Sequence, residues 1–138
     1  MIAVVDIDGV LADATHRQHH LQGRPKDWDA FFAAVGEDPP IPRGIARLGE
    51  LSLEHDVVLL SGRPERTRAD TENWLARHGI EVSGLVLRSD ADHRPAADLK
   101  ADLIARIAAP TGIAVVVDDD ATVVGRISEL GYRAELFR

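Results

Sequence analysis

Short apolar runs that alternate with segments of helical spacing constrain this chain more than any other feature. The runs are rich in Val, Ile and Leu, and they cover residues 2–5, 57–60, 85–87, 113–117 and, more weakly, 133–137. Runs of this length and composition are typical of strands buried on both faces of a parallel sheet. The sequence therefore predicts an α/β fold, a three-layer, doubly wound parallel sheet of about five strands.

Four of the segments between these runs have helical spacing, and they cover residues 42–55, 65–78, 95–109 and 121–130. Leu53 is a candidate for the buried side of the first helix. Gly79 is the expected C-cap of the second. Pro110 is expected to stop the third, because proline has no backbone N–H to donate.

A long excursion after the first strand interrupts the alternation. We expect a single domain over residues 1–138 with a small cap insertion at about residues 14–41. A short helix is predicted at roughly residues 25–35, and it contains Trp28, Phe31 and Phe32. Two interpretations fit this segment: a small satellite core under a long loop, or a flap over a functional site.

Composition excludes several classes of protein. The chain has 23 acidic and 16 basic side chains, a net charge of −7 and no cysteine. A broadly basic nucleic-acid surface, disulfides, thiolate catalysis and Cys-based zinc sites are therefore excluded, although a local basic cleft is not. No apolar run is long enough to cross a membrane. The first residues lack the pattern of a signal peptide, so a cytoplasmic location is expected.

Residues with chemical potential gather at the predicted strand ends. Open α/β sheets bind ligands at the carboxyl ends of their strands, so these residues are expected to converge. They are Asp6, Asp8 and Gly9 after the first strand, Ser61, Gly62 and Arg63 after the second, Arg88 after the third with Lys100 in the helix beyond, and Asp118, Asp119 and Asp120 after the fourth.

This set of side chains suits phosphoryl transfer. Clustered carboxylates repel one another unless a cation lies among them, and hard oxygen ligands without His or Cys indicate Mg²⁺. One carboxylate can attack phosphorus, and a second can protonate the leaving group and then activate water. Ser61 can hydrogen-bond a phosphoryl oxygen, and Lys100 can neutralise the remaining charge. Gly9 and Gly62 allow the backbone to approach the phosphate closely.

The sequence resembles the haloacid dehalogenase (HAD) superfamily of phosphohydrolases over nearly its whole length. Four signatures appear in order: Asp-x-Asp-Gly-Val at 6–10, Ser-Gly-Arg at 61–63, a lone Lys at 100 and an Asp-Asp pair at 118–119. The resemblance implies that Asp6 is nucleophile and metal ligand, and that Asp8 is the general acid/base with its carbonyl on the metal. Asp119 is the first choice for the third protein ligand to Mg²⁺. Asp118 would then orient Lys100 or a metal-bound water, and these two roles are interchangeable at this stage.

A narrower resemblance is to the 3′-phosphatase domain of bacteriophage-type polynucleotide kinase-phosphatases. It rests on Arg17, on the Ser-Gly-Arg signature, on the stretch from Arg88 through Arg94 to Lys100, and on residues 117–119. By this resemblance Arg17 and Arg63 contact phosphate or substrate, and Gly62, Arg88 and Arg94 are further substrate-binding candidates. The chain departs from the family at residues 96 and 97, which are Ala rather than acidic, and at residue 120, which is Asp rather than Arg. Asp98 is a candidate to replace the missing acid beside Lys100.

Other polar and aromatic residues have simpler interpretations. Asp13 is expected to close a turn and Asp120 to cap the following helix. Trp74 at helical spacing favours a core position over a base-stacking platform. The group His16, His19 and His20 has poor spacing for a tetrahedral zinc site; one of these side chains facing the substrate is the alternative.

These observations favour a Mg²⁺-dependent phosphomonoesterase that works through an aspartyl-phosphate and removes 3′-phosphates from DNA or RNA ends. A phosphatase of nucleotides or small phosphorylated metabolites is the second hypothesis. A non-catalytic phosphate-binding module is the alternative from another class. No Gly-x-x-x-x-Gly-Lys-[Ser/Thr] motif occurs, so a kinase or ligase that acts with this chain would be a separate partner.

Overall fold

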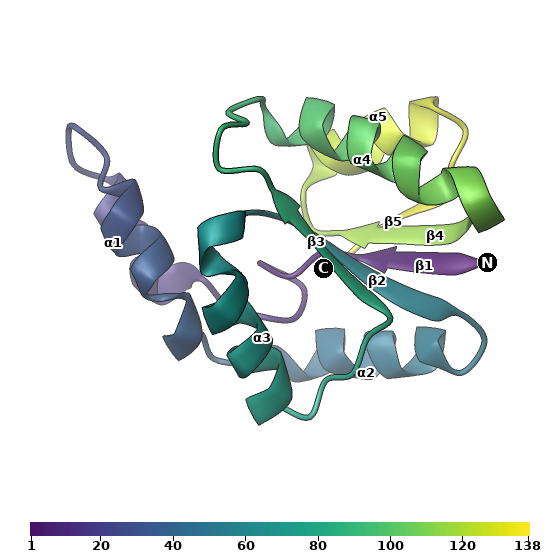
Figure 1. Ribbon diagram of the computed structural model, residues 1–138, viewed down its shortest axis with the longest axis horizontal. Helices are drawn as coiled ribbons and strands as arrows, with labels where there is room; N and C mark the ends of the chain where they lie inside the picture. The colour runs from purple at the N-terminus through teal and green to yellow at the C-terminus, as the bar shows by residue number, and fades with distance from the viewer.

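The computed structural model describes residues 1–138 and has a five-stranded parallel sheet at its centre (Figure 1). The strand order is β3-β2-β1-β4-β5, with every neighbouring pair parallel. The strands are β1 (Ile2–Val5), β2 (Asp56–Pro64), β3 (Gly84–Arg88), β4 (Ile113–Asp118) and β5 (Ala134–Leu136). The predicted fold class and strand number are confirmed. The chain leaves β1 toward one edge and later returns to β4 on its other side, so a switch point lies between β1 and β4.

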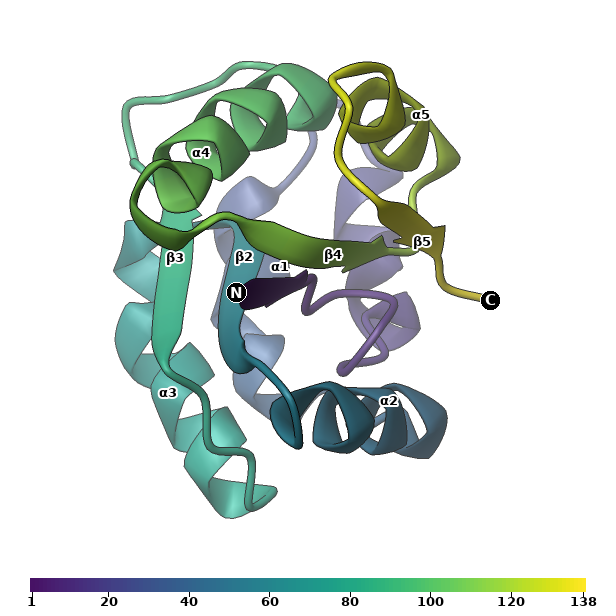
Figure 2. The ribbon, with the colours of Figure 1, turned by 90° about the vertical axis from the view of Figure 1, so that its right-hand side faces the viewer.

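Helices cover both faces of the sheet, which gives three layers (Figure 2). On one face lie α2 (Pro42–Ser52) and α3 (Arg68–Arg77), and on the other lie α4 (Ala96–Thr111) and α5 (Ala121–Glu129). Asp120 caps α5, because its carboxylate accepts the N–H groups of Thr122 and Val123. This confirms the expected cap.

Strand side chains alternate between two apolar clusters, as the pleat of a strand requires. In β1, Ala3 and Val5 belong to the cluster beneath α2 and α3, whereas Val4 belongs to the cluster beneath α4 and α5. Trp74 of α3 is fully buried in the first cluster, so its predicted core position is confirmed. Leu53 lies beyond the end of α2 and is 85% exposed, so its candidacy for the buried side is wrong.

Two predicted boundaries differ from the structure. The second strand continues through residues 61–64, with an irregular register between Leu60 and Pro64, so the Ser-Gly-Arg signature belongs to β2 and does not follow it. Helix α4 runs through Pro110 to Thr111. A proline in the last turn removes one donor without breaking the turn; the helix ends at Gly112, which has a φ of 77° and whose N–H reaches the carbonyl of Ala108.

The excursion between β1 and α2 carries a 3-10 helix at Thr15–Leu21, the short helix α1 (Trp28–Ala33) and a second 3-10 turn at Val35–Glu37. It extends to one side of the sheet and lies near the start of α3 (Figure 1). Helix α1 is shorter than the predicted span of residues 25–35.

No helix of the fold combines the length and apolar character needed to cross a membrane.

Helix α2 touches the loop after β1 so closely that one position tolerates only glycine. A Cβ at Gly44 would overlap the backbone carbonyl of Val10. Gly49 lies in the same helix with no atom within 4 Å of its would-be Cβ.

We expect Gly44→Ala to lower the free energy of unfolding by about 1–3 kcal/mol through overpacking. The matched Gly49→Ala should raise it by up to about 1 kcal/mol through helix propensity. Urea denaturation of both variants checks this, and equal stabilities would contradict the close approach.

Candidate active site

Three carboxylates from two neighbouring strands meet at the carboxyl edge of the sheet. Asp6 directly follows β1, and Asp118 and Asp119 lie at the end of β4. One oxygen from each lies within 4.8 Å of the other two. The N–H of Asp6 donates to the carbonyl of Val117 at 2.9 Å, and this bond joins the two strand ends. The predicted convergence at the switch point is therefore present.

Lys100 of α4 is the cation of this cluster. Its Nζ lies 2.6 Å from Oδ2 of Asp118 and 3.1 Å from Oδ1 of Asp6, and the side chain is buried. Burial disfavours the charged ammonium, but the attraction of Asp6 and Asp118 outweighs it and raises the pKa of Lys100. Lys100 is thus a fixed positive charge. Asp98 is exposed and pairs with Arg126, so it does not replace a partner of the lysine.

The two carboxylates at the end of β4 differ in how they are engaged. Both oxygens of Asp118 have protein partners, Lys100 and the N–H of Asp120. Asp119 forms no ion pair with a lysine or arginine, and its carboxylate lies against the backbone of Gly9. A Cβ at Gly9, where φ is 82°, would overlap that carboxylate. This difference favours Asp119 as a metal ligand and Asp118 as the group that orients Lys100.

The charge of the cluster fits a divalent cation. Three carboxylates around one ammonium leave two negative charges uncompensated. Burial, together with repulsion from Asp118 and Asp8, raises the pKa of Asp6 despite the attraction of Lys100. Burial and Asp118 also raise the pKa of Asp119. Oxygen ligands without nitrogen or sulfur suit Mg²⁺, and a bound cation would keep these carboxylates ionised.

Asp8 lines the same cleft but pairs with two buried arginines, not with Lys100. Its Oδ1 accepts Nη2 of Arg17 at 2.9 Å and Nη2 of Arg63 at 2.8 Å. Both guanidinium groups are buried, whereas the Asp8 side chain is one-third exposed to the cleft. Its Oδ2 also accepts Nε of Arg63 at 3.3 Å, so the arginines fix a carboxylate that is still partly exposed to the cleft.

Asp38 pairs with the same two arginines, and the sequence analysis did not identify it. Its carboxylate accepts Nε and Nη2 of Arg17, both at 2.8 Å, and Nη2 of Arg63 at 3.0 Å. His16 Nε2 lies 2.6 Å from Oδ1, and Trp74 donates to the backbone carbonyl of Asp38 at 2.7 Å. Asp38 lies 32 residues after Asp6 at the end of the excursion, with no motif around it. Only the tertiary structure identifies it, as a buried acid that pairs with two buried arginines.

Arg17 and Arg63 were predicted to contact phosphate or substrate. The structure instead engages their donors with Asp8, Asp38, the hydroxyl of Thr71 and the carbonyl of Phe31. The ring of Phe31 also lies 4.4 Å from the Arg17 guanidinium carbon. In this arrangement the two arginines orient Asp8, and substrate contact through them stays a prediction.

Ser61 and Gly62 lie where the irregular segment of β2 passes the site. Ser61 is buried, and its Oγ accepts the N–H of Arg63 at 3.0 Å, while no protein atom accepts its hydroxyl hydrogen. This bond orients the signature internally; Ser61 does not cap a helix. Gly62 lines the cleft above the carboxylates.

Arg88 and Arg94 bond the loop between β3 and α4 and form no ion pair with the carboxylate cluster. Arg88 donates to the backbone carbonyls of Gly62, Asp92 and Arg94 and leaves Nη2 without a protein partner. Arg94 is exposed and pairs with Asp92 and Asp102. Neither residue lines the cleft of the carboxylate cluster.

Two lesser expectations concern the excursion. The side chain of Asp13 accepts the N–H and hydroxyl of Thr15, so the expected turn is confirmed. The three histidines do not form a metal-binding group, because His16 bonds Asp38 and His19 packs on His20.

The carboxylates open onto a cleft of about 390 Å³, which we call the carboxylate cleft. Its lining includes Asp6, Asp8, Gly62, Lys100, Asp118 and Asp119. Most of the predicted catalytic and metal-binding residues are therefore brought together in one place. A carboxylate beside a buried lysine, a second carboxylate paired with two arginines and an acidic cluster that could hold a cation are the groups that phosphoryl transfer requires.

Comparison with known proteins agrees with this chemistry. Residues 1–134 match the family model described as the polynucleotide kinase PNKP phosphatase domain. A comparison with curated protein sequences finds no match.

Among solved structures, the chain is similar to one chain of the Pnkp1/Rnl/Hen1 RNA repair complex, with 23% identity and a TM-score of 0.84. That match covers 99% of this chain but only 42% of the other. A class C acid phosphatase from Bacillus anthracis with tungstate bound is 17% identical, with a TM-score of 0.71 and coverage of 99% and 65%. These likenesses show that the fold is shared.

We expect Asp38→Asn to destabilise the protein by about 3–5 kcal/mol, because it leaves two buried guanidinium groups short of one counter-charge. The exposed neighbour Glu37 provides the matched control, and Glu37→Gln should change the free energy of unfolding by less than about 0.5 kcal/mol. Denaturant titration measures both. An Asp38→Asn protein as stable as Glu37→Gln would show that the pairing does not support the fold.

Proposed function

Because the chain belongs to the family of polynucleotide kinase PNKP phosphatase domains, and is therefore a phosphatase of the haloacid dehalogenase type, we propose that it removes 3′-phosphates from nucleic acid ends. The observation that supports the mechanism is the pairing of Asp6 with Lys100 beside a separately clamped Asp8. Two carboxylates two residues apart thus have different environments, which suits different roles.

Asp6 is the proposed nucleophile. Its Oδ1 accepts the N–H of Ile7 at 2.8 Å and lies near Lys100, while Oδ2 accepts no protein hydrogen bond. A carboxylate oxygen of Asp6 forms a bond to phosphorus as the bond from phosphorus to the ester oxygen breaks. The product of this step is an aspartyl-phosphate and the free alcohol of the substrate.

Asp8 is the proposed general acid and base. In the first step it gives its proton to the departing ester oxygen, and in the second it takes a proton from the water that attacks the aspartyl-phosphate. The second step releases inorganic phosphate and restores Asp6. Arg17 and Arg63 keep the Asp8 carboxylate aimed at the cleft in both steps.

Mg²⁺ is the proposed cofactor, and when bound it would offset the charge of the phosphate and of the carboxylates. Asp6 and Asp119 would hold it, together with the backbone carbonyl of Asp8. Asp118 would act chiefly by orienting Lys100. Lys100 and the hydroxyl of Ser61 would bind phosphoryl oxygens, and the backbone at Gly62 would line their approach.

A separate kinase or ligase is a proposed partner. The structural match in the Pnkp1/Rnl/Hen1 RNA repair complex is to a chain of more than twice this length, and this chain has no phosphate-binding loop of the Walker type. An end-repair reaction that needs a 3′-hydroxyl would consume the product of the proposed phosphatase.

Substrate preference tests the proposed function directly. We expect Mg²⁺-dependent phosphate release from a 3′-phosphorylated oligonucleotide to exceed that from a 5′-phosphorylated one, from mononucleotides and from an aryl phosphate. Asp6→Asn should abolish release from all of them, because an amide oxygen is a poor nucleophile toward phosphorus. Phosphate release is measured at equal substrate concentrations. A preference for mononucleotides would support the metabolite alternative, and unchanged activity of Asp6→Asn would exclude the covalent mechanism.

The two acids that follow Asp118 provide a matched pair for the metal site. We expect Asp119→Asn to weaken Mg²⁺ activation by at least about tenfold, since a charged ligand is lost. Asp120→Asn should leave the Mg²⁺ requirement within about twofold, because Asn caps a helix as well as Asp does. The Mg²⁺ concentration that gives half-maximal activity is the measurement. Equal effects of the two substitutions would remove Asp119 from the ligand set.

A further inference from the structure

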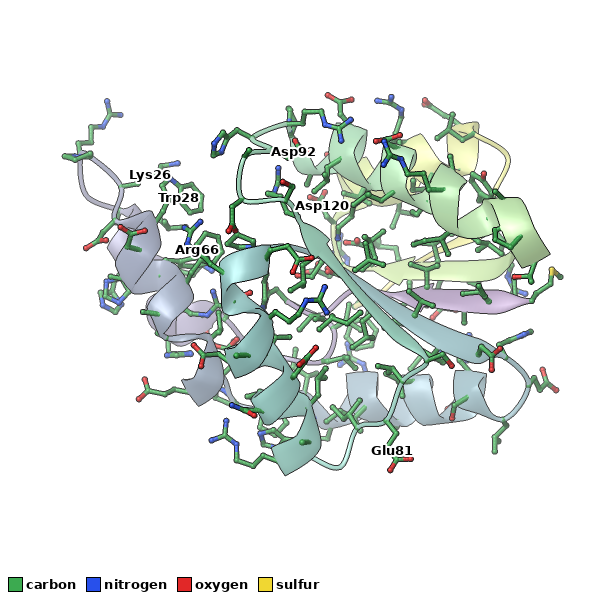
Figure 3. All side chains as sticks on the ribbon, viewed as in Figure 1. Lys26, Trp28, Arg66, Glu81, Asp92 and Asp120 are labelled. Atoms are coloured by element: carbon green, nitrogen blue, oxygen red, sulfur yellow. The ribbon has the colours of Figure 1, made fainter.

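A second cleft of about 520 Å³ lies beside the carboxylate cleft, and the proposed reaction does not use it. It runs between α1 and the loop that joins β3 to α4, and Figure 3 shows Trp28 and Arg66 on one side and Asp92 on the other. We call it the aromatic cleft. Its lining includes Trp28, Phe32, Gly62, Arg66, Arg88 and Arg94.

Aromatic side chains form one wall of this cleft. Trp28 is 47% exposed, an unusual position for so large an apolar side chain. It stacks on Phe32 with the ring centroids 5.8 Å apart and the planes 21° apart. Phe31, on the same helix, is buried and supports the pair from below through edge contacts with both rings. The wall is therefore an aromatic cluster in which the exposed ring of Trp28 is backed by two other rings.

Two cations, Lys26 and Arg66, lie against the rings of this cluster, and the carboxylates of Asp90 and Asp92 also line the cleft. The guanidinium carbon of Arg66 lies 5.2 Å from the centre of the Phe32 ring. Its Nη2 is 3.6 Å from Oδ1 of Asp29, and its Nη1 is 3.9 Å from Oδ1 of Asp90. Lys26 Nζ lies 5.8 Å from the Trp28 ring. These loosely paired cations on an exposed aromatic wall match the way proteins bind single-stranded nucleic acid.

The two clefts meet at small residues. Gly62 and Ala96 line both of them. Arg88 stands at the junction, because its Nε donates to the carbonyl of Gly62 at 3.0 Å and its Nη2 has no protein partner. A group attached to a phosphate in the carboxylate cleft can therefore extend into the aromatic cleft past Gly62.

We infer that the aromatic cleft binds the terminal nucleoside of a single-stranded 3′-phosphorylated end, with the base against Trp28 and the next phosphate near Arg66. This inference rests on the proposed function and adds to it the part of the substrate that is recognised. Stacking without hydrogen-bond readout predicts little preference among the four bases. A paired end has its last base stacked in the helix and blocked on one side, so single-stranded ends are favoured.

The test compares two oligonucleotides that differ only at the last residue. One carries a normal base on its 3′-phosphorylated end, and the other carries an abasic sugar. We expect Trp28→Ala to lower kcat/KM about 5- to 150-fold for the first, the range of one base–aromatic stacking contact. It should change kcat/KM less than twofold for the abasic substrate, because no base is present to stack. Trp28→Phe should recover most of the loss.

A charge-matched pair tests the cationic side of the cleft. Arg66→Gln should raise KM for the oligonucleotide and reduce the salt dependence of binding, since one phosphate contact is removed. Arg106→Gln on the outer side of α4, where the arginine side chain is 74% exposed, should change neither quantity.

Equal losses on base-bearing and abasic ends in Trp28→Ala, or no loss on either, would overturn the inference while leaving the proposed phosphatase intact.

Fluorescence gives a readout that does not depend on catalysis. Trp28 and Trp74 are the two tryptophans of the chain, and Trp74 is fully buried. In the Asp6→Asn protein, a base-bearing oligonucleotide should quench tryptophan emission. The added substitution Trp28→Phe should remove the quenching. Absence of quenching would overturn the inference. Quenching by a 3′-phosphorylated oligonucleotide from which the unsubstituted protein releases no phosphate would uphold the cleft while contradicting the proposed function.

Discussion

Every buried carboxylate at the carboxyl edge of the sheet depends on compensating charge, and the site is organised around this requirement. Asp8 and Asp38 face Arg17 and Arg63, so two negative and two positive groups form a balanced network. A buried charge without a partner costs several kcal/mol. The network therefore ties the excursion, β2 and the loop after β1 into one unit, because each supplies a member.

The second group of charges, formed by Lys100 and the three carboxylates of the carboxylate cluster, differs from the first because its negative and positive charges do not balance. Lys100 lies between Asp6 and Asp118 and forms ion pairs with both, whereas Asp119 forms no ion pair. The remaining negative charge faces the cleft, where a divalent cation and a phosphate can enter. Neighbouring residues of the first motif thus belong to different electrostatic environments, which suits the different roles proposed for them.

Several features were predictable because they depend on local pattern. Apolar runs of Val, Ile and Leu identified the five strands, and the order of the motifs along them identified the carboxylate site. The exposure of Leu53, the passage of α4 through Pro110 and the inclusion of Ser61 in β2 were not predicted. Each depends on how an element ends against its neighbours, which sequence spacing alone does not specify.

By itself, the sequence determined the fold class, the number of strands and the identity of most residues that meet at their carboxyl ends, because parallel strands carry whatever follows them to one edge. Tertiary structure alone decided the partners of Arg17 and Arg63 and the pairing of Asp38 with both. Burial and pairing are properties of the folded surroundings, and no spacing rule reports them. The aromatic cleft also depends on tertiary structure, since Trp28 and Arg88 come from distant segments that meet only after folding.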